Sequence, residues 1–115
     1  MTETEKGSEE KIQKLQLLEQ NMQNYLMQKQ QFQSQAVEID SALEELKDQK
    51  EAYKIVGNIM VSAKKEDLEA DLKKKKEIID LRIKSIEKQE DLIKNKAKTI
   101  QEEVLGGMKD PSDDN

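Results

Sequence analysis

Apolar residues recur along residues 9–50 with the alternating three- and four-residue spacing of a coiled-coil helix. When Leu15 is taken as heptad position a, nine of the ten a and d positions from residue 15 to residue 46 are apolar, and only Lys29 is not. The apolar members are Leu15, Leu18, Met22, Tyr25, Phe32, Ala36, Ile39, Leu43 and Leu46. Because the segment has neither Pro nor Gly and is rich in good helix formers, it predicts a coiled-coil helix over about residues 9–50.

A second helix with the same kind of pattern is predicted over about residues 63–105. Its d positions are all aliphatic, namely Leu72, Ile79, Ile86, Ile93 and Ile100. Its a positions are weaker, namely Glu69, Lys76, Ile83, Glu90, Ala97 and Val104. Ser62 is the candidate N-cap, and Gly106-Gly107 is expected to end the helix. We expect the polar residues 106–115 to form a disordered tail.

The period changes between the two helices. Residues 53–61 are rich in β-branched and aromatic side chains, and Gly57-Asn58 interrupts them. Gly followed by Asn suits a two-residue type II′ turn, so the segment predicts a β-hairpin with Val56 opposite Ile59.

Both faces of this hairpin would be apolar, because side chains alternate along a strand. One face would carry Tyr53, Ile55 and Met60, and the other Val56, Ile59 and Val61. Two isolated strands are marginally stable in water, and their open edges invite pairing. Since the chain offers no further strands, we expect other subunits to supply them. The predicted oligomerisation site therefore comprises these six residues and the turn residues Gly57 and Asn58.

A hairpin between the helices makes them antiparallel, so that an a layer of one stacks on a d layer of the other. We paired Leu15 with Ile100 so that the loop closes over the hairpin. The next layers then follow without adjustment: Leu18 with Ala97, Met22 with Ile93, Phe32 with Ile83, Ala36 with Ile79, and Leu43 with Leu72. Lys29 and Glu90 fall one layer apart, where an ion pair would fix the register. The predicted fold is mainly α, with two long antiparallel coiled-coil helices joined by a β-hairpin in one domain.

Composition argues against several kinds of catalysis. The 115 residues are 39% charged and 34% hydrophobic, which suits helices that bury a narrow stripe. A disordered chain has a similar composition but no reason to keep heptad phase. There is no Cys or His, so thiol nucleophiles, imidazole bases and the usual zinc ligands are absent from the sequence. We expect no catalytic residue, no metal site and no cofactor.

Charge and hydropathy limit the classes of partner that we expect. The net charge of −5 disfavours nucleic acid, because phosphate binding needs a basic surface. The N-terminus is polar and lacks the apolar run of a signal peptide. No segment approaches the roughly 18 apolar residues of a membrane span. We expect a cytoplasmic protein with neither a nucleic-acid nor a membrane partner.

The helix ends distant from the hairpin are the candidate site for binding other proteins. Off the seam lie Ile12, Leu17, Leu105 and Met108, beside the seam residues Leu15, Leu18, Ile100 and Val104. Apolar residues off the seam face water unless something covers them. Flexible aliphatic and Met side chains adapt to varied partners, so we interpret these eight residues as a client-binding tip. The plainer alternative is ordinary packing at the helix ends.

Other features are interpreted as ordinary surface. Single exposed apolar residues are common, and we assign Leu26, Met27, Ile78, Leu81 and Leu92 to this class. The run Lys73–Lys76 covers a full helical turn, which favours a solvated surface over a site for phosphate or acidic clients.

The segment Ala52–Val61 resembles the Tyr-Lys-x-x-Gly hairpin motif of prefoldin subunits of the β class. Gln28–Gln31 and Ile86–Glu90 also resemble that family, and the resemblance extends from about residue 12 to residue 104. The single hairpin is typical of the β class, since the α class has two, and the compact length resembles the archaeal form. The chain departs from the family at residues 47–50, where members often carry Pro.

The resemblance implies an ATP-independent holding chaperone in a hexamer of two α-class and four β-class subunits. The hairpins of such a hexamer form a double β-barrel, and the ends of its coiled coils hold unfolded client proteins and pass them to a group II chaperonin. The main alternative is a structural coiled-coil scaffold or tether, which explains the heptads but not a hairpin apolar on both faces. A membrane-surface helix is less favoured, because the polar face is not net basic.

Overall fold

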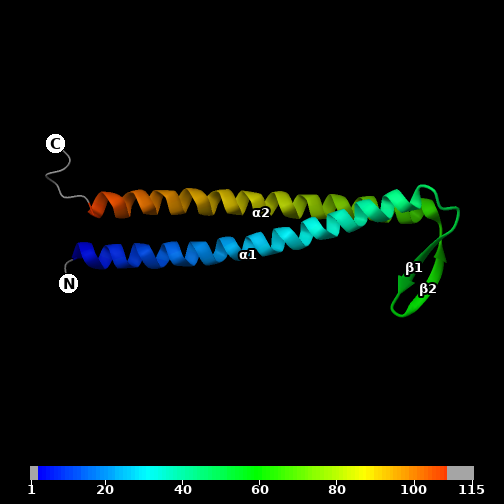
Figure 1. The fold of residues 1–115 in the computed structure, drawn as a ribbon, viewed down its shortest axis with the longest axis horizontal. Helices are drawn as coiled ribbons and strands as arrows, with labels where there is room; N and C mark the ends of the chain where they lie inside the picture. Colours follow the sequence, from blue (N-terminus) through cyan, green and yellow to red (C-terminus); the bar gives the residue numbers. More distant parts are fainter. Residues whose placement is uncertain (1–2, 109–115) are drawn as a thin grey trace. The chain divides into compact units, whose positions relative to one another are not determined.

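The computed structural model describes the backbone of residues 3–108 and the side chains of residues 7–106. The elements are helix α1 (Glu3–Leu46), strand β1 (Ala52–Val56), strand β2 (Ile59–Ala63) and helix α2 (Lys65–Met108), in that order (Figure 1). The predicted fold class, two long antiparallel helices joined by a β-hairpin, is confirmed. The chain divides into a terminal unit, residues 1–28 and 86–115, and a hairpin unit, residues 29–85. We describe each unit by itself.

Burial follows the heptad pattern in both units. Every a and d position of the helices between residues 7 and 106 is buried or half-buried. The most buried residues of the terminal unit are Ile86, Ile93 and Glu90, and those of the hairpin unit are Ile79 and Ala52. Among the described residues, every buried side-chain nitrogen or oxygen has a hydrogen-bond partner. The core of each unit is therefore the narrow seam that the sequence predicted.

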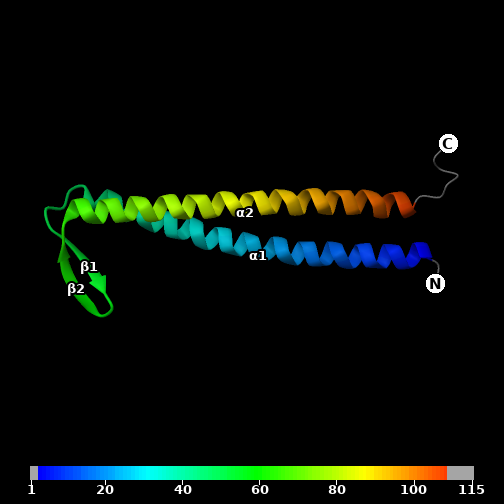
Figure 2. The ribbon, with the colours of Figure 1, turned by 180° about the vertical axis from the view of Figure 1, so that it is seen from behind.

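In the terminal unit the two helices lie side by side and antiparallel in both views (Figures 1 and 2). The Lys11 Nζ lies 3.4 Å from the Glu103 Oε2, which joins α1 to α2. The predicted register places these two residues beside each other, so this contact agrees with the pairing of Leu15 with Ile100.

In the hairpin unit the helices make two cross-helix contacts that agree with the same register. The Lys76 ammonium forms an ion pair with Asp40. The Arg82 guanidinium carbon lies 5.9 Å from the centre of the Phe32 ring, within the range of a cation–π contact.

The hairpin has the predicted register. Val56 pairs with Ile59 and Ile55 with Met60, and pairing continues to Ala52 opposite Ala63. Gly57 has a φ of 62°, and no non-glycine residue of the described chain has a positive φ. A positive φ at the first turn position only is the pattern of a type II′ turn.

The end of α1 differs from the prediction of about residue 50. The helix ends at Leu46, its last seam residue, and the N–H of Gln49 donates to the Leu46 carbonyl at 3.2 Å. The next four residues are polar, so continuing the helix would bury nothing. The helix begins at Glu3, earlier than the expected residue 9.

The bounds of α2 also differ from the predicted 63–105. Ser62 does not cap the helix, because it lies in β2 opposite Tyr53. The helix begins at Lys65, with Glu66 and Asp67 in its first turn, where the dipole favours them. It continues through Gly106-Gly107 to Met108, since each helical Gly costs only about 1 kcal/mol relative to Ala. The rest of the predicted tail lies outside the described residues.

Candidate interaction sites

The hairpin is the first candidate site, and its apolar side chains face solvent. They range from 37% exposed at Val61 to 70% exposed at Ile55. The exposed set is Tyr53, Ile55, Val56, Ile59, Met60 and Val61. The register puts Tyr53, Ile55 and Met60 on one face and the other three on the opposite face, so both faces are apolar as predicted.

The backbone hydrogen bonding of the hairpin is also incomplete. The sheet has two strands, so each strand has one edge without a neighbour among the residues that the structure describes. Unpaired N–H and C=O groups along such an edge form hydrogen bonds readily with another strand. Lys54 is the only charged residue in either strand, which leaves little to oppose such pairing.

Polar contacts fix the base of the hairpin. The Tyr53 hydroxyl donates to the Glu51 Oε2 at 2.7 Å, and this bond, with a smaller effect of burial, raises the pKa of Tyr53 above its ordinary 10.0. The Lys65 Nζ donates to the Lys47 carbonyl at 2.6 Å. The first residue of α2 thereby satisfies a carbonyl just beyond the end of α1.

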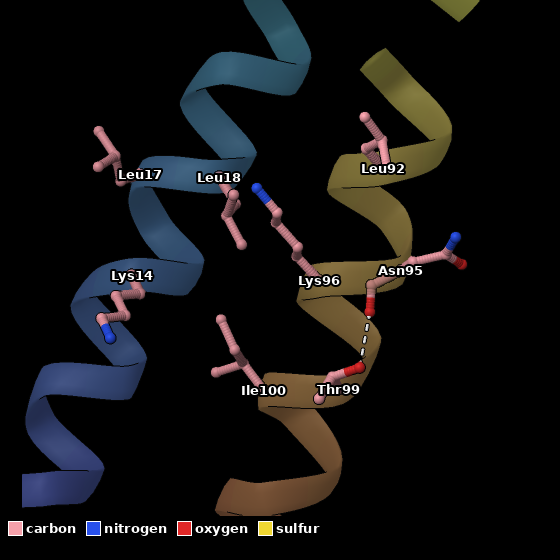
Figure 3. Close-up of a pocket in the computed structure, with 8 residues that line it drawn as sticks. All are labelled: Lys14, Leu17, Leu18, Leu92, Asn95, Lys96, Thr99 and Ile100. Carbon is pink, nitrogen blue, oxygen red and sulfur yellow. Dashed lines mark hydrogen bonds between the residues drawn. The ribbon is translucent and has the colours of Figure 1, made fainter. Parts of the chain in front are cut away.

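The second candidate site is a groove of about 450 Å³ in the terminal unit. It is lined by Lys14, Leu17, Leu18, Leu92, Asn95, Lys96, Thr99 and Ile100 (Figure 3). Leu18 and Ile100 extend into the space between the helices, and the Lys96 side chain stretches across it toward Leu18. We call this feature the groove.

Helical spacing explains why these residues meet. Lys14, Leu17 and Leu18 are three and four residues apart, so they share one side of α1. Leu92, Lys96 and Thr99 are likewise four and three residues apart on α2. The Thr99 hydroxyl donates to the Asn95 carbonyl at 3.0 Å, which satisfies it within its own helix. The groove surface is therefore dominated by aliphatic side chains.

The structure brings together only part of the predicted tip. Leu17, Leu18 and Ile100 line the groove. Of the remaining predicted residues, Ile12 and Leu105 are exposed and Leu15 and Val104 are half-buried, but none of these four lines the groove. Met108 ends α2, and its side chain lies outside the described ones.

Leu92 was missed by the sequence analysis, which assigned it to ordinary surface. It is 51% exposed and lines the groove opposite α1. Leu92 precedes the seam residue Ile93, just as Leu17 precedes Leu18, so both leucines occupy heptad position c. That shared position is the signal that could have identified Leu92.

A polar pocket of about 400 Å³ lies in the hairpin unit. It is lined by Asp40, Leu43, Glu44, Lys47, Glu69, Lys73 and Lys76. Its charges are paired in part: Lys47 contacts Glu44 at 3.1 Å, and the hydrogen bond that the Lys76 ammonium donates to Asp40 raises the pKa of Lys76 above 10.5. Basic and acidic residues balance in this pocket, so it favours neither sign of ligand.

Neither helix, over its described residues, has a stretch long and apolar enough to cross a membrane. The same residues contain no group of three or more carboxylates arranged to hold a metal ion.

Comparison with known proteins gives concordant results. A family model described as a prefoldin subunit matches residues 9–109. Prefoldin subunit beta of Archaeoglobus fulgidus is 35% identical over 96 residues, covering 81% of this chain and 83% of the relative. Prefoldin subunit beta of Methanospirillum hungatei is 36% identical over 106 residues, covering 87% and 88%. The crystal structure of the prefoldin beta subunit from Thermococcus strain KS-1 is similar with a TM-score of 0.86 at 27% identity, covering 90% of this chain and 94% of that one.

Proposed function

The chain belongs to the prefoldin subunit family, a family of chaperone subunits, and from this premise we propose that it is an ATP-independent holding chaperone. In this proposal the chain assembles through its hairpin with other prefoldin subunits. It holds non-native proteins at the terminal unit and delivers them to a group II chaperonin in the cytoplasm.

The observation that carries the proposal is that the chain exposes apolar surface at two sites, one in each unit. A chaperone subunit of this kind needs one surface for permanent assembly and another for exchangeable clients. The hairpin and the groove differ in the way that these two tasks require, because only the hairpin offers open strand edges.

The hairpin supports a hexamer of two α-class and four β-class subunits. Six exposed apolar residues and two open edges would be covered if hairpins from several subunits joined into a β-barrel. The predicted oligomerisation residues are the surface that would be buried in that barrel.

The groove supports the holding activity. Its aliphatic side chains can contact apolar segments that a folded client would hide, and their flexibility suits varied clients. We therefore revise the proposed client site to the groove residues, with Leu92 added to the predicted Leu17, Leu18 and Ile100. Binding of this kind requires no nucleotide, metal or other cofactor.

The test is to co-express the chain with an α-class prefoldin subunit, measure the mass of the assembly, and follow the aggregation of a chemically denatured protein without ATP. We expect a hexamer that suppresses aggregation at near-stoichiometric amounts. A chain truncated after Thr99 loses Ile100 and the residues beyond it, and should assemble but no longer suppress aggregation.

The rival function is a coiled-coil scaffold or tether. An assembly that is only a dimer of this chain and leaves aggregation unchanged would favour the scaffold and contradict the proposal.

A further inference from the structure

We propose that the groove selects client segments that combine apolar side chains with neighbouring carboxylates, so that acidic amphipathic segments bind better than basic ones. This inference rests on the proposed function, because it names the class of client that is held at the same site.

The aliphatic lining residues of the groove provide the apolar part of the selection. They are Leu17 and Leu18 from α1 and Leu92 and Ile100 from α2. A volume of about 450 Å³ is in the range of about 300–1,000 Å³ that ligand pockets occupy. It can therefore take several side chains of one extended or helical segment, but not a folded domain.

Two lysines of the same lining provide the charge. Lys14 on α1 and Lys96 on α2 are the charged residues that line the groove, and no carboxylate lines it. Neither lysine has an ion-pair partner within the described residues, whereas the neighbouring Lys11 is paired with Glu103. The two ammonium groups would each gain a partner from a bound carboxylate and would be repelled by a bound lysine or arginine.

The Lys96 side chain brings a positive charge close to the aliphatic side chains of the groove. It stretches across the space between the helices toward Leu18 (Figure 3). A lysine in this arrangement can lay its methylene stem along apolar surface while its ammonium stays in water. The cation consequently lies close to aliphatic lining residues such as Leu18, where an acidic residue next to a bound leucine of the client would reach it.

The charge preference is local and does not follow from the chain as a whole. The net charge is −5, which would repel acidic segments at long range. At physiological salt this repulsion is screened beyond about 8 Å. The polar pocket of the hairpin unit has as many acidic as basic lining residues, so it has no comparable preference.

The test measures two fluorescent peptides with the same apolar residues, one flanked by Glu and one by Lys, against the hexamer that contains the full chain. An exposed ion pair changes affinity only a few-fold, so two lysines should separate the peptides by about tenfold in Kd. The double variant Lys14→Glu/Lys96→Glu should abolish or reverse that order. The control Lys94→Glu/Lys98→Glu makes the same change in net charge on exposed lysines of α2 that do not line the groove, and should keep it.

Equal binding of both peptides by the unmodified hexamer would overturn the inference, as would a control variant that loses the preference as completely as the groove variant. If Lys14→Glu/Lys96→Glu fails to fold by circular dichroism, Lys14→Gln/Lys96→Gln decides instead, with the preference expected to disappear. Suppression of aggregation is measured on the same samples. Intact suppression without a charge preference refutes this inference alone, whereas absence of both binding and suppression refutes the proposed function as well.

Discussion

The hairpin and the groove both expose apolar side chains, but they differ in the state of their backbone. In the hairpin, each strand has an edge without a partner in the described part of the chain. The groove is made by two helices, whose N–H and C=O groups are paired inside each helix. Strand edges need a neighbour with a fixed register, whereas helix side chains accept any segment of suitable size and polarity.

This difference indicates which surface suits permanent assembly and which suits the binding and release of clients. Hydrogen bonds along a strand edge are directional, so they favour one partner strand in one register. Contacts with aliphatic side chains are non-directional and tolerate many partners. The same apolar character can therefore serve assembly in one unit and client holding in the other.

The largest effect is expected from charge in the hairpin. Val56→Asp with Ile59→Asp would bury two carboxylates in the proposed intersubunit β core, at a cost of several kcal/mol. Assembly with the α-class subunit should be lost, while helicity by circular dichroism is largely retained. Analytical ultracentrifugation measures the mass.

The matched control for that variant is Val37→Asp with Leu81→Asp. These two residues are also exposed and apolar, at 64% and 66%, but they lie on the helices. The control should sediment as the hexamer. A hexamer of unchanged mass for the hairpin variant would contradict the role given to the hairpin.

The next prediction distinguishes a seam residue from a groove residue by substituting two neighbours in the sequence. Ile93 is 8% exposed, so Ile93→Ala should destabilise the terminal unit by about 2–5 kcal/mol. Leu92 is half-exposed, so Leu92→Ala should cost much less. Thermal unfolding followed by circular dichroism measures both, and equal losses would show that Leu92 belongs to the seam.

A smaller effect is expected at the hairpin turn. Gly57 has a φ of 62°, which a residue with a Cβ adopts at a cost of about 1–2 kcal/mol. Nothing in this chain lies within 4 Å of a Cβ placed there, so within the chain the cost of Gly57→Ala is backbone strain. The variant should still assemble, but its hexamer should dissociate at a lower temperature. A hexamer as heat-stable as the parent would mean that the turn contributes nothing to assembly.

The smallest effect concerns the pairing of Lys76 with Asp40 in the hairpin unit. The hydrogen bond to Asp40 raises the pKa of Lys76 in the folded state above 10.5. A raised lysine pKa means that the pairing stabilises the fold below pH 10.5, and that this contribution is lost as the pH rises through the raised value. Asp40→Asn should therefore lower the melting temperature slightly at neutral pH and not at strongly alkaline pH. The same small difference at both pH values would contradict this assignment.

The heptad spacing predicted the helices and their buried seam, because the 3-4 repeat keeps the a and d positions facing the partner helix. The hairpin register followed from Gly57, since a two-residue turn leaves one way to pair the strands. The helix ends were less predictable. The place of Ser62 in β2 and the continuation of α2 through Gly106-Gly107 depend on differences of about 1 kcal/mol between competing local structures.

The groove was only partly predictable. Leu17, Leu18 and Ile100, which line the groove, belong to the predicted tip because they lie near the helix ends and carry apolar side chains. Ile12 and Leu105 satisfied the same criterion but occupy heptad positions e and b. These positions face a different side of each helix from position c, which Leu17 and Leu92 occupy. Leu92 was missed because a lone exposed leucine is common, although it shares heptad position c with Leu17 and lines the same groove.

The most direct test of the account asks whether holding can be removed while assembly remains. Leu17→Ser with Leu92→Ser changes two exposed residues of the groove and leaves the seam and the hairpin intact. The molecular mass of the assembly with the α-class subunit is measured, and its suppression of client aggregation is measured on the same sample. The account predicts a hexamer of normal mass that no longer suppresses aggregation. A hexamer of normal mass with full suppression would contradict it.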